Sequence, residues 1–201
     1  MKRCAAVVVV LGLAFLSGCL PPGPIGPTPG AALFFDDFEG GRDPAWNSTP
    51  YWDVLDGEFY GAGAGCGYAY VTTGVNWANY AVEVDLTMSD SSVGFLVRCQ
   101  SSLQSYVALE GDYSELHWRV YEDGTQVAAS SRIAPGFFGG SQRVKIVVEG
   151  STYTLYVNDL LRSSFVDSRF LTGTPGLESC LWFYMGPEQC SKFDNLRVTA
   201  Q

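Results

Sequence analysis

Basic residues are scarce in this sequence. Lys and Arg total 12 against 21 Asp and Glu, which gives a formal net charge of -9. A polyanion would be repelled by this charge, so we expect no nucleic acid partner. Glycine and proline, at 23 and 10 of 201 residues, are too few for a low-complexity chain, and apolar residues make up 47%. This length and composition predict one globular domain, two at most.

Sequence motifs of common catalytic and metal sites are also missing. His117 is the only histidine, and no GxSxG turn supports it as part of a Ser-His-Asp triad. No CxxC pair and no EF-hand loop occur, which argues against zinc and against that type of calcium site. The glycine-rich stretch 61–67 lacks the Lys-Ser/Thr of a phosphate loop, so we interpret it as a loop or bulge.

No segment shows a convincing amphipathic helix, and the apolar residues follow a period of two instead. Residues 80–88 alternate between apolar and polar, as in a strand with one face in a core and one in water. The same alternation occurs at 143–149 and 152–157, with turn sequences such as Asp-Gly between the runs. These patterns predict an all-β fold, a two-sheet antiparallel jelly-roll sandwich of about a dozen strands.

The N-terminus has the layout of a secretory signal. Two basic residues precede an apolar run at 5–15, and residues 16–19 read Leu-Ser-Gly-Cys. This ending resembles the lipobox of bacterial lipoprotein signals, in which the signal peptide is removed and the following cysteine is lipidated. The resemblance implies a signal peptide at residues 1–18 and a lipid anchor on Cys19. An uncleaved signal anchor at residues 4–20, at the short end of what spans a bilayer, is the alternative.

The segment after Cys19 is rich in proline and glycine. Residues 20–30 contain five prolines and three glycines, a composition that favours extended chain and cannot build a core. We therefore expect a tether at residues 19–31, followed by a domain at residues 32–201. Leu20 stands where Asp marks inner-membrane retention in well-studied lipoproteins, so the resemblance implies the outer membrane and an extracytoplasmic domain.

Short motifs along the domain resemble those of a known family. They are the segments 34–39 (FFDDFE), 52–57 (WDVLDG), 80–84 (YAVEV), 94–98 (GFLVR), 153–158 (YTLYVN) and 193–198 (FDNLRV), with Trp46 and Gly176. In this order they resemble the concanavalin A-like, or laminin-G-like, jelly rolls of bacterial secreted proteins, over nearly all of residues 33–199. The resemblance implies the jelly-roll fold. Its bacterial members include sugar-binding modules, glycoside-hydrolase relatives and the 3-keto-disaccharide hydrolase group.

Four cysteines lie beyond the signal and lipidation sequence: Cys66, Cys99, Cys180 and Cys190. An even number outside the cytoplasm favours disulfides, and three pairings are possible. We favour Cys180 with Cys190, because the segments around these two cysteines read as neighbouring strands joined by a Gly-Pro turn. Cys66 would then pair with Cys99.

Acidic residues occur at both ends of the domain. Asp37 and Glu39 lie near the first expected strand and Asp194 lies on the last, and the two terminal strands commonly lie side by side in such jelly rolls. Because carboxylate oxygens are the ligands that calcium takes, we predict one structural calcium ion held by these three residues. The alternative is that the carboxylates are solvated strand ends.

One strand carries a possible catalytic pair. Glu83 and Asp85 share one face of the strand at 80–88, about 7 Å apart, and resemble the start of the Glu-x-Asp-x-x-Glu strand of retaining glycosidases of this fold class. Met88 occupies the sixth position, so the carboxyl that would protonate the leaving group is missing. We therefore assign no catalytic residue and interpret the pair as a solvated strand face.

Binding is better supported than chemistry. Aromatic residues make up 14% of the chain, and exposed rings beside polar groups suit the apolar face and hydroxyls of a sugar. The strand at 115–121 alternates, which leaves His117, Arg119 and Tyr121 outward. We predict a shallow polar groove lined by these three residues and by Glu83, Asp85 and Arg98.

The sequence therefore predicts a lipid-anchored extracytoplasmic module that binds a carbohydrate or an envelope component without catalysis. Two alternatives stay open. One is an enzyme related to glucanases or 3-keto-disaccharide hydrolases, and the other is a structural lipoprotein that interacts with envelope proteins.

Overall fold

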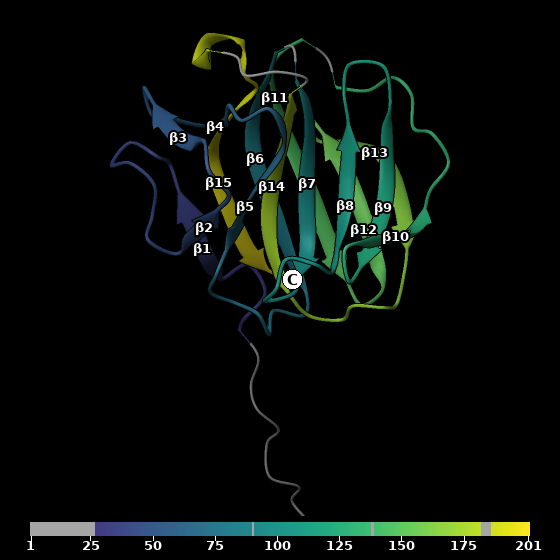
Figure 1. Ribbon diagram of the computed structural model, residues 1–201. Coiled ribbons are helices and arrows are strands. Elements are labelled where there is room, and N and C mark those ends of the chain that lie inside the picture. The colour runs from purple at the N-terminus through teal and green to yellow at the C-terminus, as the bar shows by residue number, and fades with distance from the viewer. Residues whose placement is uncertain (1–26, 90, 138, 182–185) are drawn as a thin grey trace, which may run out of the picture.

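The computed structural model describes residues 27–89, 91–137, 139–181 and 186–201 (Figure 1). These residues form 15 strands and one short 3-10 helix, η1 (Pro187–Gln189). The strands make two antiparallel sheets that pack face to face, so the predicted all-β jelly-roll sandwich is confirmed. The signal peptide and Cys19 lie outside the described residues. Within the described ranges, no helix is long and apolar enough to cross a membrane.

Sheet A has eight strands and includes both ends of the domain. Seven of them follow one path of hydrogen-bonded neighbours: β13 (Leu160–Val166), β12 (Thr152–Val157), β11 (Gly140–Glu149), β6 (Tyr80–Met88), β15 (Lys192–Ala200), β4 (Glu58–Gly61) and β3 (Trp52–Leu55). The eighth strand, β1 (Ala32–Asp36), pairs antiparallel with β15. The first and last strands of the domain therefore lie side by side, as expected.

Sheet B has seven strands and faces the viewer in Figure 1. Its order is β10 (Thr125–Ala129), β9 (Leu116–Glu122), β8 (Tyr106–Gly111), β7 (Ser92–Cys99), β14 (Thr174–Leu181), β5 (Gly65–Val71) and β2 (Trp46–Ser48). Strands β14 and β15 follow each other in the chain but belong to different sheets. Many other pairs of consecutive strands are likewise divided between the two sheets. For this reason the sequence alone did not assign the strands to sheets.

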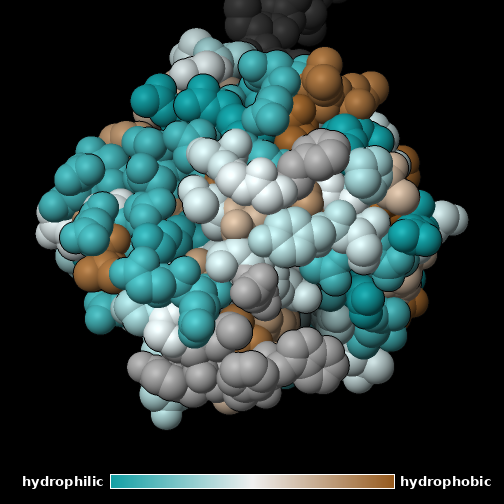
Figure 2. All heavy atoms as spheres, turned by 90° about the horizontal axis from the view of Figure 1, so that it is seen from above, coloured by the Kyte–Doolittle hydropathy of each residue, from teal (hydrophilic) through white to brown (hydrophobic). Residues whose placement is uncertain are grey.

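The inner faces of the two sheets form one apolar core. Val84 and Leu86 of β6 are buried, while Glu83 and Asp85 point outward, so the predicted alternation is confirmed. Trp118 of β9 is fully buried, and burial of each such large side chain contributes about 1.5–3 kcal/mol. Seen from above, hydrophilic residues gather over one side of this end of the sandwich, and apolar residues show at its edge (Figure 2).

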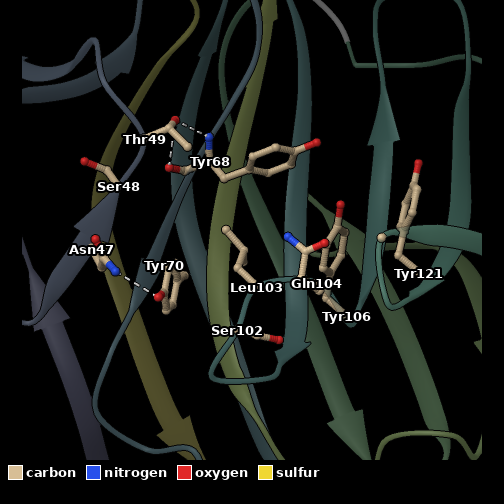
Figure 3. A pocket seen from close by; sticks show the side chains of 11 residues that line it. Asn47, Ser48, Thr49, Tyr68, Tyr70, Ser102, Leu103, Gln104, Tyr106 and Tyr121 are labelled. Carbon is tan, nitrogen blue, oxygen red and sulfur yellow. Dashed lines mark hydrogen bonds between the residues drawn. The ribbon is translucent and has the colours of Figure 1, made fainter.

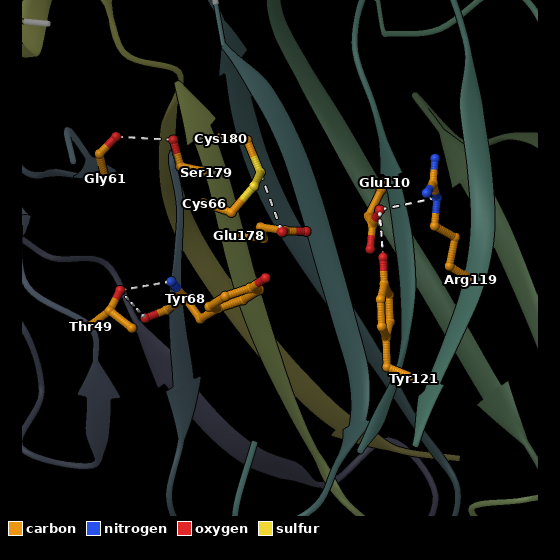
Figure 4. The surroundings of a disulfide bond; sticks show 10 residues. All are labelled: Thr49, Gly61, Cys66, Tyr68, Glu110, Arg119, Tyr121, Glu178, Ser179 and Cys180. Carbon is orange, nitrogen blue, oxygen red and sulfur yellow. Dashed lines mark hydrogen bonds and ion pairs between the residues drawn. A yellow bond between two sulfur atoms is a disulfide. The ribbon is translucent and has the colours of Figure 1, made fainter. Parts of the chain in front are cut away.

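The disulfide differs from the predicted pairing, because it joins Cys66 to Cys180. Cys66 on β5 is directly opposite Cys180 on β14, so both side chains leave the same face of sheet B (Figure 4). The predicted bond between Cys180 and Cys190 is wrong because β14 and β15 are in different sheets. Cys190 instead packs with Leu181 and Ala62.

The predicted bond between Cys66 and Cys99 is wrong as well. In the register of β7 with β14, Ser92 lies beside Cys180, whereas Cys99 lies at the other end of β7, beside Thr174. At about 3.3 Å per residue, this places Cys99 roughly 20 Å from the bridge. Cys99 and Cys190 are both buried and free.

Candidate functional site

The outer face of sheet B holds a groove of about 540 Å³ (Figure 3). Strands β2 and β5 form one side, strands β8 and β9 form the other, and the β7–β8 connection contributes Leu103. The groove is rich in aromatic and amide side chains: Tyr68, Tyr70, Tyr106, Tyr121, Asn47 and Gln104.

Strands β14, β7 and β8 lie between the tyrosines of β5 and β9. Gly176 of β14 lies between Tyr70 of β5 and Leu96 of β7, and Ala108 of β8 follows beside Leu96. A Cβ atom on Gly176 would lie 2.7 Å from the carbonyl oxygen of Ala69, so glycine is required there. Leu96 is fully buried there and packs in one apolar cluster with Tyr68, Tyr106 and Tyr121.

The tyrosine rings support one another. The ring centroids of Tyr106 and Tyr121 are 4.9 Å apart, and those of Tyr68 and Tyr106 are 6.2 Å apart. On the other side, the Asn47 amide donates a 2.8 Å hydrogen bond to the Tyr70 hydroxyl. A surface whose rings are already held in place loses less conformational entropy when a ligand binds.

The hydroxyls of Tyr68, Tyr106 and Tyr121 stay neutral over the physiological pH range. Burial, with a further contribution from the charge of Glu178, raises the pKa of Tyr68 to about 12. Burial also raises the pKa of Tyr106 and of Tyr121 above its ordinary value. Each neutral hydroxyl can both donate and accept a hydrogen bond, as sugar hydroxyls require.

Two glutamates lie on either side of β7 beside the groove, Glu178 from β14 and Glu110 from β8 (Figure 4). Gly94 of β7 is paired with both of them. A Cβ atom on Gly94 would lie 2.5 Å from Glu178 Oε2 and 3.4 Å from Glu110 Cγ. The missing side chain at Gly94 is therefore what allows the two acidic side chains to approach each other.

The two carboxyls differ in their neighbours. Burial, and then the charge of Glu110, raises the pKa of Glu178 to about 8, so this carboxyl is mostly protonated at pH 7. Burial raises the pKa of Glu110 too, against the effect of Arg119, whose Nε lies 3.2 Å from Glu110 Oε2. The Tyr121 hydroxyl also donates to Glu110 at 3.4 Å. Glu110 thus has two partners that favour its carboxylate form.

Three of the six predicted groove residues lie on this face. His117, Arg119 and Tyr121 point outward from β9, as the alternation predicted. Tyr121 lines the groove, whereas Arg119 pairs with Glu110 and His117 Nε2 lies 3.3 Å from a carboxylate oxygen of Glu115.

Arg98 does not reach the groove, and its predicted place there is wrong. It is fully buried, and its backbone has a positive φ of 57°, which interrupts the alternation of β7. The guanidinium donates hydrogen bonds to the carbonyl oxygens of Trp77, Gly150 and Leu171. Arg98 therefore joins loops at one end of the sandwich.

Glu83 and Asp85 lie on the opposite side of the molecule from the groove. They point outward from β6 in sheet A, where Glu83 pairs with Lys145 at 2.9 Å and Asp85 pairs with Arg143 at 3.2 Å. The expectation of one groove shared by all six residues is wrong, because β6 and β9 belong to different sheets.

The three carboxylates predicted to hold calcium do not fit a metal site as they stand. Among the described residues, a single group of three potential ligand side chains has its atoms close together, and it does not include Asp37, Glu39 or Asp194. Asp194 instead accepts a hydrogen bond of 3.0 Å from the Asn195 side chain. The group that does come together contains Cys66 and Cys180, whose sulfur atoms are bonded to each other and so offer no thiolate.

Several groove residues were missed from the sequence. The alternation of Tyr68 and Tyr70 on β5 was a usable signal, but the glycines before it suggested a loop. Nothing in the local sequence marks Glu178 or Glu110, because their proximity depends on the order of β14, β7 and β8 in sheet B.

Comparison with known proteins identifies the fold. No protein-family model and no curated protein sequence matches the chain. Among solved structures, the carbohydrate-binding module CBM66 from Bacillus subtilis is similar with a TM-score of 0.62 and 20% identity, over 78% of this chain and 96% of that one. The β-glucanase of Bacillus licheniformis has a TM-score of 0.61 and 11% identity, over 84% and 97% of the two chains.

A carbohydrate recognition domain gives a similar result. The carbohydrate recognition domain of Emp47p has a TM-score of 0.60 and 9% identity, over 83% of this chain and 94% of that one. These similarities confirm the concanavalin A-like jelly roll. At such identities they establish the fold, and the function has to be argued from the groove.

Proposed function

We propose that this protein is a lipid-anchored extracytoplasmic module that binds carbohydrate in the tyrosine groove of sheet B without cleaving it. The observation that carries the proposal is the set of four tyrosines around a groove of about 540 Å³. CBM66 and the Emp47p domain, which share the fold, are named for carbohydrate binding, and this supports the proposal by analogy.

The chemistry of the groove suits an uncharged saccharide. The apolar C–H face of a sugar ring can pack on Tyr68 or Tyr121, while its hydroxyls find the amides of Asn47 and Gln104. The positive charge of Arg119 is already paired with Glu110, so it is not free to neutralise an acidic sugar. We therefore expect neutral glycans to bind more tightly than sulfated or carboxylated ones.

A glycan array probed with the chain from Ala31 onward tests the proposal. We expect retention of neutral glycans, confirmed by titration calorimetry with the best of them. Tyr156→Ala serves as a control, because this tyrosine is on β12 in sheet A, away from the groove. Absence of retention on every glycan, together with a protein partner recovered by crosslinking, would favour the structural lipoprotein instead.

A glycoside hydrolase is the second candidate, and the proximity of Glu110 and Glu178 favours it. Two carboxyls with different protonation states are what acid-base cleavage of a glycosidic bond uses. Turnover of the array's best glycan, abolished by Glu110→Gln and by Glu178→Gln, would establish this alternative. A glycan that is bound but not cleaved would support the binding module.

The lipid anchor on Cys19 is proposed from the lipobox alone. Mass spectrometry of the mature N-terminus is the direct check, and we expect a lipidated cysteine as the first residue. A mature chain that starts elsewhere, or an unmodified Cys19, would contradict the anchor.

The calcium ion predicted at Asp37, Glu39 and Asp194 stays a prediction. Burial raises the pKa of Asp194, and the charges of Asp85, Glu58 and Glu39 add to the rise, which is the electrostatic support for this ion. A bound cation would reduce this repulsion, but only after the carboxylates moved closer together than they are here.

A further inference from the structure

The two sulfurs of the Cys66–Cys180 bridge differ in accessibility. Cys66 is exposed near the start of β5, whereas Cys180 on β14 is half-buried. A disulfide is opened by a thiolate that attacks one sulfur and releases the other. Because an external thiolate can approach Cys66 more freely, Cys180 becomes the leaving sulfur.

A buried carboxyl lies next to this leaving sulfur (Figure 4). Glu178 Oε1 is 3.3 Å from Cys180 Sγ, and only 4% of Glu178 is exposed. A thiolate released in a poorly solvated place is costly unless it is neutralised. A protonated Glu178 would supply the proton at that point.

The groups around Glu178 keep it protonated near neutral pH. The titratable and charged side chains around it are Glu110 and Tyr106 from β8, Tyr68 from β5, and Arg119 and Tyr121 from β9. His117 of β9 lines the same depression as Glu178 and Cys180. Burial and Glu110 raise the pKa of Glu178 to about 8, while Tyr68 and Arg119 oppose the rise. Since a free thiol has a pKa of about 8.5, a proton moves between Glu178 and Cys180 at little cost.

We infer that Glu178 is the acid-base catalyst of thiol-disulfide exchange at the Cys66–Cys180 bridge. An external thiolate attacks Cys66 Sγ and forms a mixed disulfide with it. The bond between the two cysteines breaks, and its electron pair passes to Cys180 Sγ. Glu178 gives its proton to that sulfur, which leaves a Cys180 thiol and a Glu178 carboxylate.

The second thiol of a dithiol reductant then releases Cys66, so reduction consumes one dithiol and yields one cyclic disulfide. In the oxidising direction, the Glu178 carboxylate removes the proton of Cys180, and the thiolate formed attacks a mixed disulfide at Cys66. This chemistry does not depend on whether the neighbouring groove binds sugar.

The free cysteines of the domain do not compete in this exchange. Burial raises the pKa of the Cys99 thiol and of the Cys190 thiol. A buried neutral thiol is a poor nucleophile. The bridge is therefore the reactive sulfur site among the described residues.

The test is the rate of reduction of the full chain by dithiothreitol, from about pH 6 to about pH 10, a range that spans the pKa values of thiols and of Glu178. Free thiols are trapped with a maleimide, and the peptides of Cys66 and Cys180 are quantified by mass spectrometry. Each rate is divided by the concentration of dithiothreitol thiolate. For the unmodified chain, this rate constant should fall as the pH passes about 8.

Glu178→Gln should remove that fall. The variant's rate constant should be flat across the range, and about tenfold or more below that of the unmodified chain at the acidic end. At the alkaline end the rate constant of the variant should equal or exceed that of the unmodified chain. The reason is that Glu178 of the unmodified chain is then a carboxylate, which repels the attacking thiolate. Glu149→Gln, at an exposed position at the end of β11, should behave as the unmodified chain does.

Two results would overturn the inference. One is a Glu178→Gln profile that superimposes on that of the unmodified chain. The other is a rate constant of Glu178→Gln that is lower by the same factor at every pH and still falls near pH 8, since such a result would reflect altered packing alone. Glu110→Gln gives an independent check that retains Glu178: removal of the neighbouring charge should move the step to lower pH, and an unmoved step would also contradict the inference.

Discussion

The two outer faces of the sandwich carry similar residues in different surroundings. On sheet A, Glu83 and Asp85 sit beside Lys145 and Arg143 in ion pairs that are partly open to solvent. On sheet B, Glu178 is almost completely buried, next to a second glutamate and three tyrosines. The carboxylates on sheet A are in contact with water, whereas Glu178 on sheet B is shielded from it.

This difference shows that the neighbours of a residue, more than its type, decide what it can do. An exposed ion pair contributes little to stability, about 0–1 kcal/mol. A buried carboxyl kept protonated becomes a hydrogen-bond donor and a proton source. In the sequence, Glu83 and Asp85 were the possible catalytic pair, whereas in the structure the buried carboxyl is that of Glu178.

The largest expected effect is on the pH dependence of stability. The pKa of Glu178 is about 8 in the folded state against a usual 4.5, so the folded state holds this proton more tightly than the unfolded state. Its contribution is complete below pH 4.5 and is lost as the pH rises through about 8. We expect the free energy of unfolding to fall by about 5 kcal/mol over that interval.

Glu178→Gln should remove most of this fall, and Glu83→Gln on sheet A should leave it in place. Urea unfolding of the disulfide-intact domain at a series of pH values measures both. Equal pH dependence in the Glu178→Gln variant and the unmodified chain would show that Glu178 ionises in the folded state as freely as in the unfolded state, and the contrast between the faces would disappear.

The next largest effect concerns the groove tyrosines. Tyr68→Ala and Tyr121→Ala should each weaken glycan binding by about tenfold or more, since loss of an aromatic contact removes about 1–2 kcal/mol. Tyr156→Ala, on the outer face of sheet A, should bind as the unmodified chain does. Calorimetric titration compares the three variants, and equal losses in all of them would mean that the effect is not local to the groove.

How much of this could be read from the sequence depends on the range of the interaction. The inward and outward alternation of β6 and β9 is local, and it was predicted correctly. The approach of Glu178 to Glu110 requires three strands from distant parts of the chain. The positive φ that turns Arg98 inward, and the partner of Cys66, likewise depend on contacts formed only in the folded sheet.

A smaller effect is expected from the ion pairs of sheet A. Lys145→Ala removes the partner of Glu83 and should change the free energy of unfolding by less than about 1 kcal/mol, because both side chains are partly exposed. Denaturant unfolding in low and high salt is the measurement. A larger loss of free energy of unfolding that does not change with salt would indicate that the ion pair of Lys145 and Glu83 is shielded from solvent.

The smallest effect is expected from calcium. Since Asp37, Glu39 and Asp194 are not gathered as ligands, a bound ion would have to pull them together, and its net stabilisation would be correspondingly weak. Melting of the disulfide-intact domain in millimolar calcium and then in chelator is the check. Coincident melting temperatures would remove calcium from the account.

Sugar binding at sheet B is tested most directly by NMR titration of the isotope-labelled domain with the best neutral glycan from the array. We predict that chemical-shift changes concentrate at Tyr68, Tyr106 and Tyr121, and that β6 and β11 on the opposite face are unaffected. Changes centred on Glu83 and Asp85, or no changes at saturating glycan, would contradict the assignment of the groove as the binding site.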